Sequence, residues 1–76
     1  MFKGKTLLIT GGTGTFGNAV LKRFLKTEVA EIRIFSRDEK KQEDQRLFYK
    51  SPKLKFYIGD VRSPDSLAAA MNGVDY

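Results

Sequence analysis

Three glycines at regular spacing could bind the phosphates of a ligand. Gly11, Gly14 and Gly17 follow a strand-like apolar run and lead into a segment with helical spacing of apolar residues. The first allows a sharp turn, the second lets a phosphate approach the main chain, and the third lets the helix pack closely on the strand. The helix N-terminus adds free N–H groups and a positive dipole end. The pattern predicts a dinucleotide pyrophosphate site; a tight turn without a ligand is the alternative.

The elements that must position this turn alternate between strands and helices. The predicted strands span 5–10, 31–36 and 53–58, and the predicted helices span 14–27, 38–49 and 64–72. Asp38 and Ser63 stand at N-cap positions, and Gly73 follows the third helix. Residues 74–76 begin a fourth strand beside the first. This order predicts an α/β fold of Rossmann type, with an open parallel sheet, strand order 3-2-1 and helices on both faces.

Each predicted element also has apolar residues that should be buried. The continuous apolar run of the first strand is typical of a strand inside a parallel sheet. The residues expected in the core are Phe16, Ala19, Val20, Leu21 and Phe24 in the first helix, Ile32, Ile34 and Phe35 in the second strand, Leu47 and Phe48 in the second helix, Leu54, Phe56 and Ile58 in the third strand, and Leu67, Ala70 and Met71 in the third helix.

The composition excludes several classes of site. The sequence has 76 residues with neither cysteine nor histidine, which argues against disulfides, thiolate or imidazole metal sites, and Ser-His or Cys-His nucleophiles. The net charge of +5 is spread over separate faces rather than one stripe, so we expect no nucleic-acid partner. We see no signal peptide and no apolar run long enough to span a membrane, and we therefore expect a cytoplasmic protein.

The end of the second predicted strand is where a dinucleotide's adenosine ribose would be recognised. NAD-binding proteins place an acidic residue there, whereas this chain has Ser36 followed by Arg37, with Lys40 and Lys41 close behind. A guanidinium binds a phosphate through two hydrogen bonds and cannot accept one from a hydroxyl. The pattern favours NADP over NAD. Asp38 is the alternative, since it could accept from the ribose if the strand ended later.

Asp60 and Val61 follow the third predicted strand and should face the same crevice. The carboxylate could accept a hydrogen bond from the adenine amino group while Val61 packs on the ring. The alternative is that Asp60 only supports the next turn through Arg62 or Ser63. With the glycine turn upstream, we favour the adenine contact.

These motifs resemble the extended short-chain dehydrogenase/reductase superfamily, whose T-G-x-x-G-x-x-G signature matches residues 10–17 and whose Asp-Val pair matches residues 60–61. Residues 11–18, 32–41 and 55–62 are similar in particular to bacterial polysaccharide-biosynthesis enzymes that act on UDP-N-acetylglucosamine. Those enzymes are 4,6-dehydratases, some of which also epimerise C5. The resemblance covers essentially the whole chain. It implies that residues 1–76 form the N-terminal part of an NAD(P)-binding Rossmann domain.

The resemblance also implies tightly held NADP. Together with the residue patterns above, it predicts cofactor binding by Gly11, Thr13, Gly14, Thr15, Phe16, Gly17, Ser36, Arg37, Asp38, Lys40, Lys41, Asp60 and Val61. In the family, a hydride passes from sugar C4 to NADP⁺, water is lost across C5–C6, and the hydride returns to C6. The family's acid/base and sugar-binding residues lie beyond the fourth strand, so we expect no catalytic residue here and a UDP-sugar only in the full-length protein.

Two further expectations concern this stretch of chain. Tyr49 and Lys53 fit the superfamily's Tyr-x-x-x-Lys catalytic pattern, but Pro52 prevents a helix that would bring them onto one face. The free edge of the first strand would invite pairing with another chain, so we expect a homo-oligomer. The alternative function is a stand-alone dinucleotide-binding module without catalysis.

Overall fold

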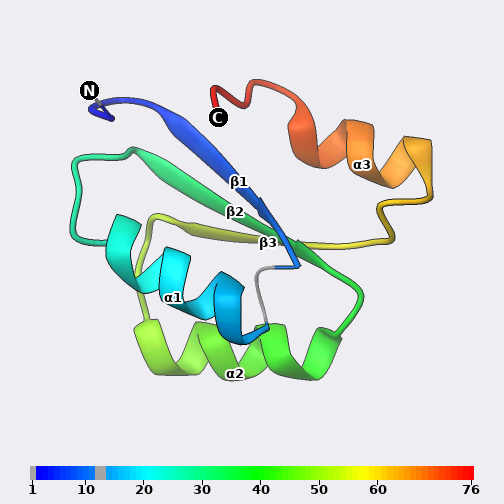
Figure 1. Ribbon diagram of the computed structural model, residues 1–76, viewed down its shortest axis with the longest axis horizontal. Helices are drawn as coiled ribbons and strands as arrows, with labels where there is room; N and C mark the ends of the chain where they lie inside the picture. The colour runs from blue at the N-terminus through cyan, green and yellow to red at the C-terminus, as the bar shows by residue number, and fades with distance from the viewer. Residues whose placement is uncertain (1, 12–13) are drawn as a thin grey trace.

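The computed structural model describes residues 2–11 and 14–76, in which strands and helices alternate (Figure 1). The elements are β1 (Thr6–Thr10), α1 (Thr15–Phe24), β2 (Glu31–Ser36), α2 (Glu39–Tyr49), β3 (Leu54–Ile58) and α3 (Pro64–Met71). Each predicted element is present. The first helix ends at Phe24 rather than at residue 27. Just after its end, the Thr27 hydroxyl donates a hydrogen bond to the Phe24 carbonyl at 2.7 Å.

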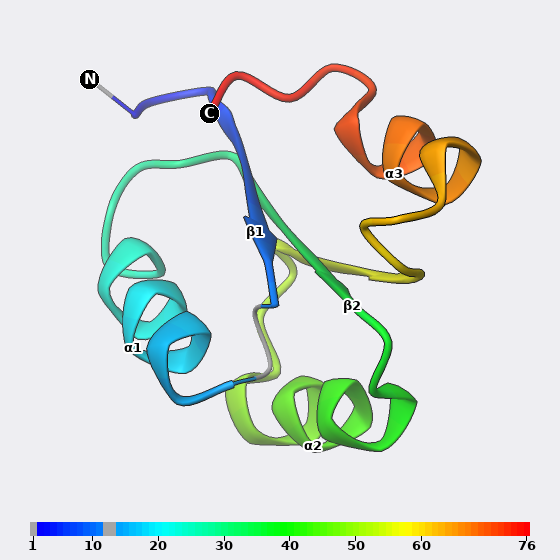
Figure 2. The same cartoon turned by 45° about the vertical axis from the view of Figure 1, so that its right-hand side comes forward.

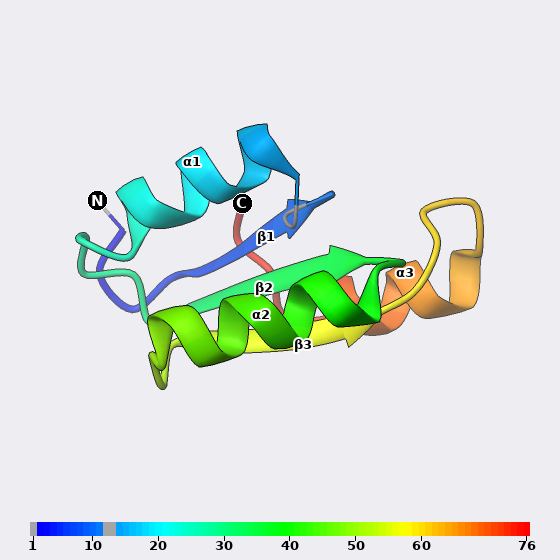
Figure 3. The ribbon, with the colours of Figure 1, turned by 90° about the horizontal axis from the view of Figure 1, so that it is seen from below.

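The strands form a parallel sheet in the order β1-β2-β3, as the sequence predicts. Thr10 of β1 is paired with Phe35 of β2, and Ser36 is paired with Ile58 of β3. Helices α1 and α2 run side by side along one face, and α3 covers the other (Figures 2 and 3). All three carboxyl ends of the strands therefore reach the same edge of the sheet.

Residues 75–76 lie against the free side of β1, where a fourth strand was predicted. The Tyr76 N–H donates to the Thr6 carbonyl at 3.3 Å, and the Leu8 N–H donates to the Tyr76 carbonyl at 3.1 Å. These two bonds form the pattern of a parallel pair. The Asp75 carboxylate also accepts from the Thr6 N–H at 2.8 Å. Residues 75–76 therefore lie beside β1, where the fourth strand was predicted, although the sheet itself has three strands.

The core is built around β2, whose Ile32, Ile34 and Phe35 side chains are buried as predicted. The buried apolar residues that surround Ile32 and Ile34 are Leu7, Ile9, Leu21, Val29 and Leu54. Asp38 caps α2 by accepting from the Lys41 N–H at 3.0 Å. Ser63 stands at the N-cap of α3, but its side chain makes no capping hydrogen bond.

Several apolar residues predicted to be buried are exposed instead. Helix α1 faces the sheet along Gly17 and Leu21. Consecutive residues of a helix are about 100° apart around its axis, so Phe16 points away from the sheet and is 82% exposed. In α2, the buried side chains are Gln42 and Gln45. The exposed residues that we predicted to be core are Phe16, Ala19, Leu47, Phe48, Ile58 and Met71.

Gly59 lies against the buried Phe35 ring, a contact that was not predicted from the sequence. A Cβ at residue 59 would lie 2.8 Å from two Phe35 ring carbons and 2.8 Å from the Ser66 hydroxyl. The Gly59 N–H also donates to the Ser36 carbonyl at 3.0 Å. Any side chain here must therefore displace a ring that is only 1% exposed.

We expect Gly59→Ala to lower the free energy of unfolding by about 1–3 kcal/mol through overpacking against Phe35. Urea unfolding followed by circular dichroism measures this change. Gly14→Ala is the matched control, because among the described residues a Cβ there meets the Gly11 carbonyl oxygen at an ordinary 3.6 Å and no closer atom. Equal losses in the two variants would contradict the close contact.

Candidate functional site

A cleft of about 860 Å³ opens at the carboxyl ends of the three strands. In parallel α/β sheets, ligands bind at this edge. The cleft is lined by Gly11, Phe35, Ser36, Arg37, Asp38, Glu39, Gly59, Asp60, Val61 and Arg62. The structure thus brings together six of the predicted cofactor-binding residues: Gly11, Ser36, Arg37, Asp38, Asp60 and Val61.

The glycine turn borders this cleft through Gly11, which has a φ of +65°. A side chain would strain that conformation, so the structure accounts for glycine here. The Gly11 N–H donates to the Phe35 carbonyl at 2.9 Å, and the Gly11 carbonyl accepts from the Gly14 N–H at 3.1 Å. Gly14 is the N-cap of α1. The two described glycines of the turn, Gly11 and Gly14, therefore lie at the end of β1 and at the helix N-terminus, which is where phosphates bind in folds of this kind.

Among the residues that the structure describes, the other predicted members of this turn are not in the lining of the cleft. Thr15 and Phe16 are exposed in the first turn of α1, and Gly17 is buried in the same helix. Thr13 lies outside the described residues, as does Gly12. Phosphate binding by the turn therefore stays a prediction.

The end of β2 presents a basic residue to the cleft. The strand ends at Ser36, which is buried at the cleft wall, and Arg37 follows with a side chain that is 71% exposed. Asp38 lines the cleft, but its Oδ1 accepts from the Lys41 N–H as the cap of α2. Because the strand does not extend past Ser36, the condition for Asp38 to serve as the ribose acceptor is not met.

Two predicted lysines lie outside the lining of the cleft. Lys40 is paired with Asp44 at 3.6 Å on the exposed side of α2. Lys41 lines a separate hollow of about 420 Å³ together with Asn18, Phe48 and others. The structure therefore does not bring either lysine into the lining of the cleft.

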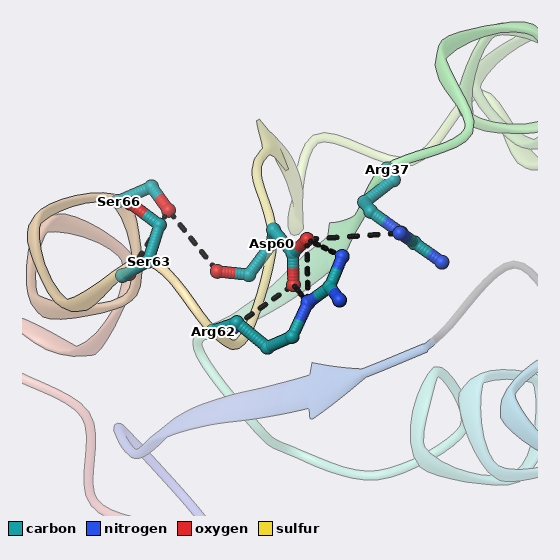
Figure 4. A network of polar contacts seen from close by, with 5 residues as sticks. All are labelled: Arg37, Asp60, Arg62, Ser63 and Ser66. Carbon is teal, nitrogen blue, oxygen red and sulfur yellow. Dashed lines mark hydrogen bonds and ion pairs between the residues drawn. The ribbon is translucent and has the colours of Figure 1, made fainter.

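Asp60 accepts hydrogen bonds from Arg62 at the floor of the cleft (Figure 4). The Arg62 Nε lies 3.2 and 3.1 Å from the two carboxylate oxygens, and its Nη2 lies 2.8 Å from Oδ2. The Arg62 N–H donates to Oδ1 at 2.9 Å, and the Arg37 Nη1 is 3.6 Å from Oδ2. The hydrogen bonds from Arg62 lower the pKa of Asp60 to about 2. Arg37 and Arg62 therefore share the Asp60 carboxylate in a cleft whose lining also includes Asp38 and Glu39.

The main chain of the same residue holds the turn into α3. The Asp60 carbonyl accepts from the Ser63 N–H at 2.8 Å and from the Ser66 hydroxyl at 3.3 Å. The turn-supporting role that we weighed for Asp60 is therefore present. Contact with an adenine stays a prediction. Arg62 was named only as a partner of that turn, and its position two residues after Asp60 was the available signal that it also reaches the cleft.

The Tyr-x-x-x-Lys pattern does not form a catalytic pair. Tyr49 ends α2, whereas Lys53 precedes β3 and donates from Nζ to the Thr27 carbonyl at 2.8 Å. Neither residue lines the cleft. Within residues 2–11 and 14–76, no cluster of three or more acidic side chains could hold a metal ion. No helix in these ranges has the length and apolar character needed to cross a membrane.

Residues 7–76 match the family described as polysaccharide biosynthesis protein. The chain belongs to this family. It is 68% identical over 80 aligned positions to proteins named UDP-glucose 4-epimerase from Rickettsia felis and Rickettsia conorii. These alignments cover 100% of this chain and 24% of each relative, so the chain spans about a quarter of their length.

Solved structures agree with this assignment. Pen from Bacillus thuringiensis superposes with a TM-score of 0.94 at 37% identity, over 100% of this chain and 24% of that one. An NADPH-bound carbonyl reductase from chicken fatty liver has a TM-score of 0.73 at 25% identity, over 92% of this chain and 30% of that one. The resemblance to polysaccharide-biosynthesis members of the short-chain dehydrogenase/reductase superfamily is confirmed, as is the Rossmann-type fold.

The ion pairs of Asp60 predict a dependence of stability on acid. The fold lowers the pKa of Asp60 from 3.8 to about 2, so its contribution is present above pH 4 and is lost as the pH falls toward 2. Asp60→Asn should therefore reduce stability at pH 7 and have a smaller effect at pH 2. Urea unfolding of both proteins at the two pH values measures the difference.

Arg62→Gln tests the cause of this dependence. This variant keeps the Asp60 carboxylate but removes the guanidinium that holds it ionised. It should reproduce most of the loss of Asp60→Asn at pH 7, and the two changes together should cost less than their sum. A loss from Asp60→Asn that is equal at pH 7 and pH 2 would contradict the assignment.

Proposed function

We propose that residues 1–76 form the N-terminal part of a domain that binds NADP, and that the cleft holds the adenosine end of this cofactor. The observation that carries the proposal is the exposed Arg37 on the rim of a cleft that begins at the positive-φ turn of Gly11. A basic residue at the end of the second strand suits a ribose 2′-phosphate, and a glycine turn beside it suits a pyrophosphate.

The residues of the cleft fit the parts of such a cofactor. A Cβ built on Gly11 meets no atom of the described residues within 4 Å, which supports an approach of a ligand to the main chain at this point. Val61, exposed at the cleft, offers an apolar surface for an adenine ring. Arg37 and Arg62 supply positive charge. The cleft contains charge and apolar surface in the combination that a phosphorylated adenosine needs.

The reaction that we propose is the conversion of a UDP-sugar in surface-polysaccharide synthesis. The family match and the resemblance to UDP-N-acetylglucosamine 4,6-dehydratases support this class. Bound NADP would supply the hydride chemistry of this reaction. The part played by this chain is to bind and orient the cofactor through the cleft. Sugar binding and proton transfer belong to the full-length protein.

A UDP-sugar 4-epimerase is a second candidate, which the names of the Rickettsia relatives favour. The two reactions differ in their products, because a dehydratase product is lighter than its substrate by one water and an epimerase product has the same mass. Mass spectrometry after incubation of the complete natural gene product with UDP-N-acetylglucosamine or UDP-glucose separates them. Cofactor binding without turnover of either sugar would favour a module without catalysis.

Arg37→Asp tests the choice of cofactor. We expect the natural protein to bind NADPH more tightly than NADH, and the variant to lose about ten- to a hundredfold in NADPH affinity with little loss for NADH. The reason is that a carboxylate repels the 2′-phosphate that the guanidinium attracts. Isothermal titration calorimetry with both nucleotides measures the two affinities.

Arg23→Asp is the matched control, since it makes the same charge change on an exposed residue of α1 away from the cleft. It should leave the ratio of NADPH to NADH affinity unchanged. An unchanged ratio in Arg37→Asp as well would remove Arg37 from cofactor selection. Absence of binding of either nucleotide to the folded natural protein would refute the proposed site.

A further inference from the structure

The side chain of Gln42 lies beneath the cleft, where it is 1% exposed and joins α2 to the ends of two strands. Its Nε2 donates to the Tyr57 carbonyl at 2.9 Å and to the Ser36 hydroxyl oxygen at 3.0 Å, with the Ser36 carbonyl at 3.5 Å. A buried amide that contacts a residue of the cleft wall can affect what that wall presents to a ligand.

The chemistry of these partners fixes which way the amide points. Backbone carbonyls only accept hydrogen bonds, so the nitrogen of Gln42, and not its oxygen, must face Tyr57 and Ser36. One amide hydrogen then serves the Tyr57 carbonyl and the other serves the Ser36 hydroxyl. Ser36 is therefore an acceptor toward Gln42.

This arrangement leaves the hydrogen of the Ser36 hydroxyl for the cleft. Ser36 lines the cleft, and none of the hydrogen bonds found among residues 2–11 and 14–76 has its hydroxyl as donor. A serine hydroxyl has one hydrogen and two lone pairs. Because Gln42 occupies a lone pair, the group that Ser36 offers to a ligand is an O–H donor.

We infer that Gln42 is a positioning residue that makes Ser36 select a phosphate. A phosphate dianion only accepts hydrogen bonds, and a bond between a neutral donor and an anion is stronger than one between neutral groups. The inference rests on the proposed binding of NADP, whose 2′-phosphate would lie at Ser36 and Arg37. It adds a residue that would select the phosphate without touching it.

The test compares two ligands that differ only in that phosphate. They are adenosine 2′,5′-bisphosphate (2′,5′-ADP), which carries a 5′- and a 2′-phosphate, and 5′-AMP, which carries the 5′-phosphate alone. Isothermal titration calorimetry on the complete natural gene product gives the affinity for each. Gln42→Met should lower the ratio of 2′,5′-ADP to 5′-AMP affinity about three- to tenfold. Without the amide, the Ser36 hydroxyl loses the group that occupies its lone pair and is free to turn its hydrogen away from the cleft.

A double-mutant cycle shows whether Gln42 acts through Ser36. Ser36→Ala should lower the same ratio about tenfold, and Gln42→Met in that background should lower it no further. If Gln42 had only a structural role, Gln42→Met would weaken the binding of both ligands by the same factor. That loss of affinity would also be the same in the Ser36→Ala background.

Gln45→Met is the matched control, because Gln45 is a second buried amide on α2 that donates to Asn18 Oδ1 at 2.7 Å instead of contacting Ser36. We expect it to lower stability and leave the ratio unchanged. A fall in the ratio equal to that of Gln42→Met would overturn the inference.

A measurement on the natural protein covers the case in which Gln42→Met fails to fold. In ¹⁵N-edited NMR spectra, the side-chain amide signals of Gln42 should shift on addition of 2′,5′-ADP and less with 5′-AMP, while those of Gln45 stay in place. Equal shifts with both ligands, or an unchanged ratio of 2′,5′-ADP to 5′-AMP affinity in folded Gln42→Met, would refute the role of Gln42 and leave the proposed binding of NADP standing. A natural protein that does not prefer 2′,5′-ADP would refute NADP binding and this inference with it.

Discussion

The parallel pairing of β1, β2 and β3 is the constraint on which the cleft depends. It brings three chain segments that are distant in sequence to one edge of the sheet, and Phe35 at the end of β2 joins two of them. The Phe35 carbonyl accepts from the Gly11 N–H, and its buried ring packs where a side chain on Gly59 would have to lie. The position of the glycine turn relative to the Asp60 turn is therefore determined by the packing of one strand.

In a cleft that also contains Asp38, Glu39 and Asp60, the exposed Arg37 is the group that favours a ligand with phosphates. Asp60 stays ionised because Arg62 donates several hydrogen bonds to it, and Arg37 is a more distant partner at 3.6 Å. Exposed ion pairs contribute little to stability. The pair between Arg37 and Asp60 thus offers little competition to a phosphate, while Arg62 holds the carboxylate and keeps the turn into α3 in shape. The two arginines have different tasks although they share one counter-ion.

The sequence predicts those features that depend on local chemistry. Gly11 requires a positive φ, Asp38 caps its own helix, and the apolar run of β2 is buried, so each could be read from neighbouring residues. The faces of the helices could not, because the packing of the whole sheet decides which side of α2 is covered. Phe48 is 79% exposed for this reason. The contact between Gly59 and Phe35 joins two strands and leaves no local signal.

The burial of Gln42 shows why an apolar face was a poor guide to α2. This helix meets the sheet where the Ser36 hydroxyl and the Tyr57 carbonyl accept hydrogen bonds from Gln42, so a leucine at the same position would lose both bonds. Each such bond contributes about 0.5–1.5 kcal/mol, so the loss of two is comparable to the gain from burying a leucine. A long amide satisfies these groups and fills the space. The residue that secures the helix to the sheet is therefore also the one that contacts the wall of the cleft.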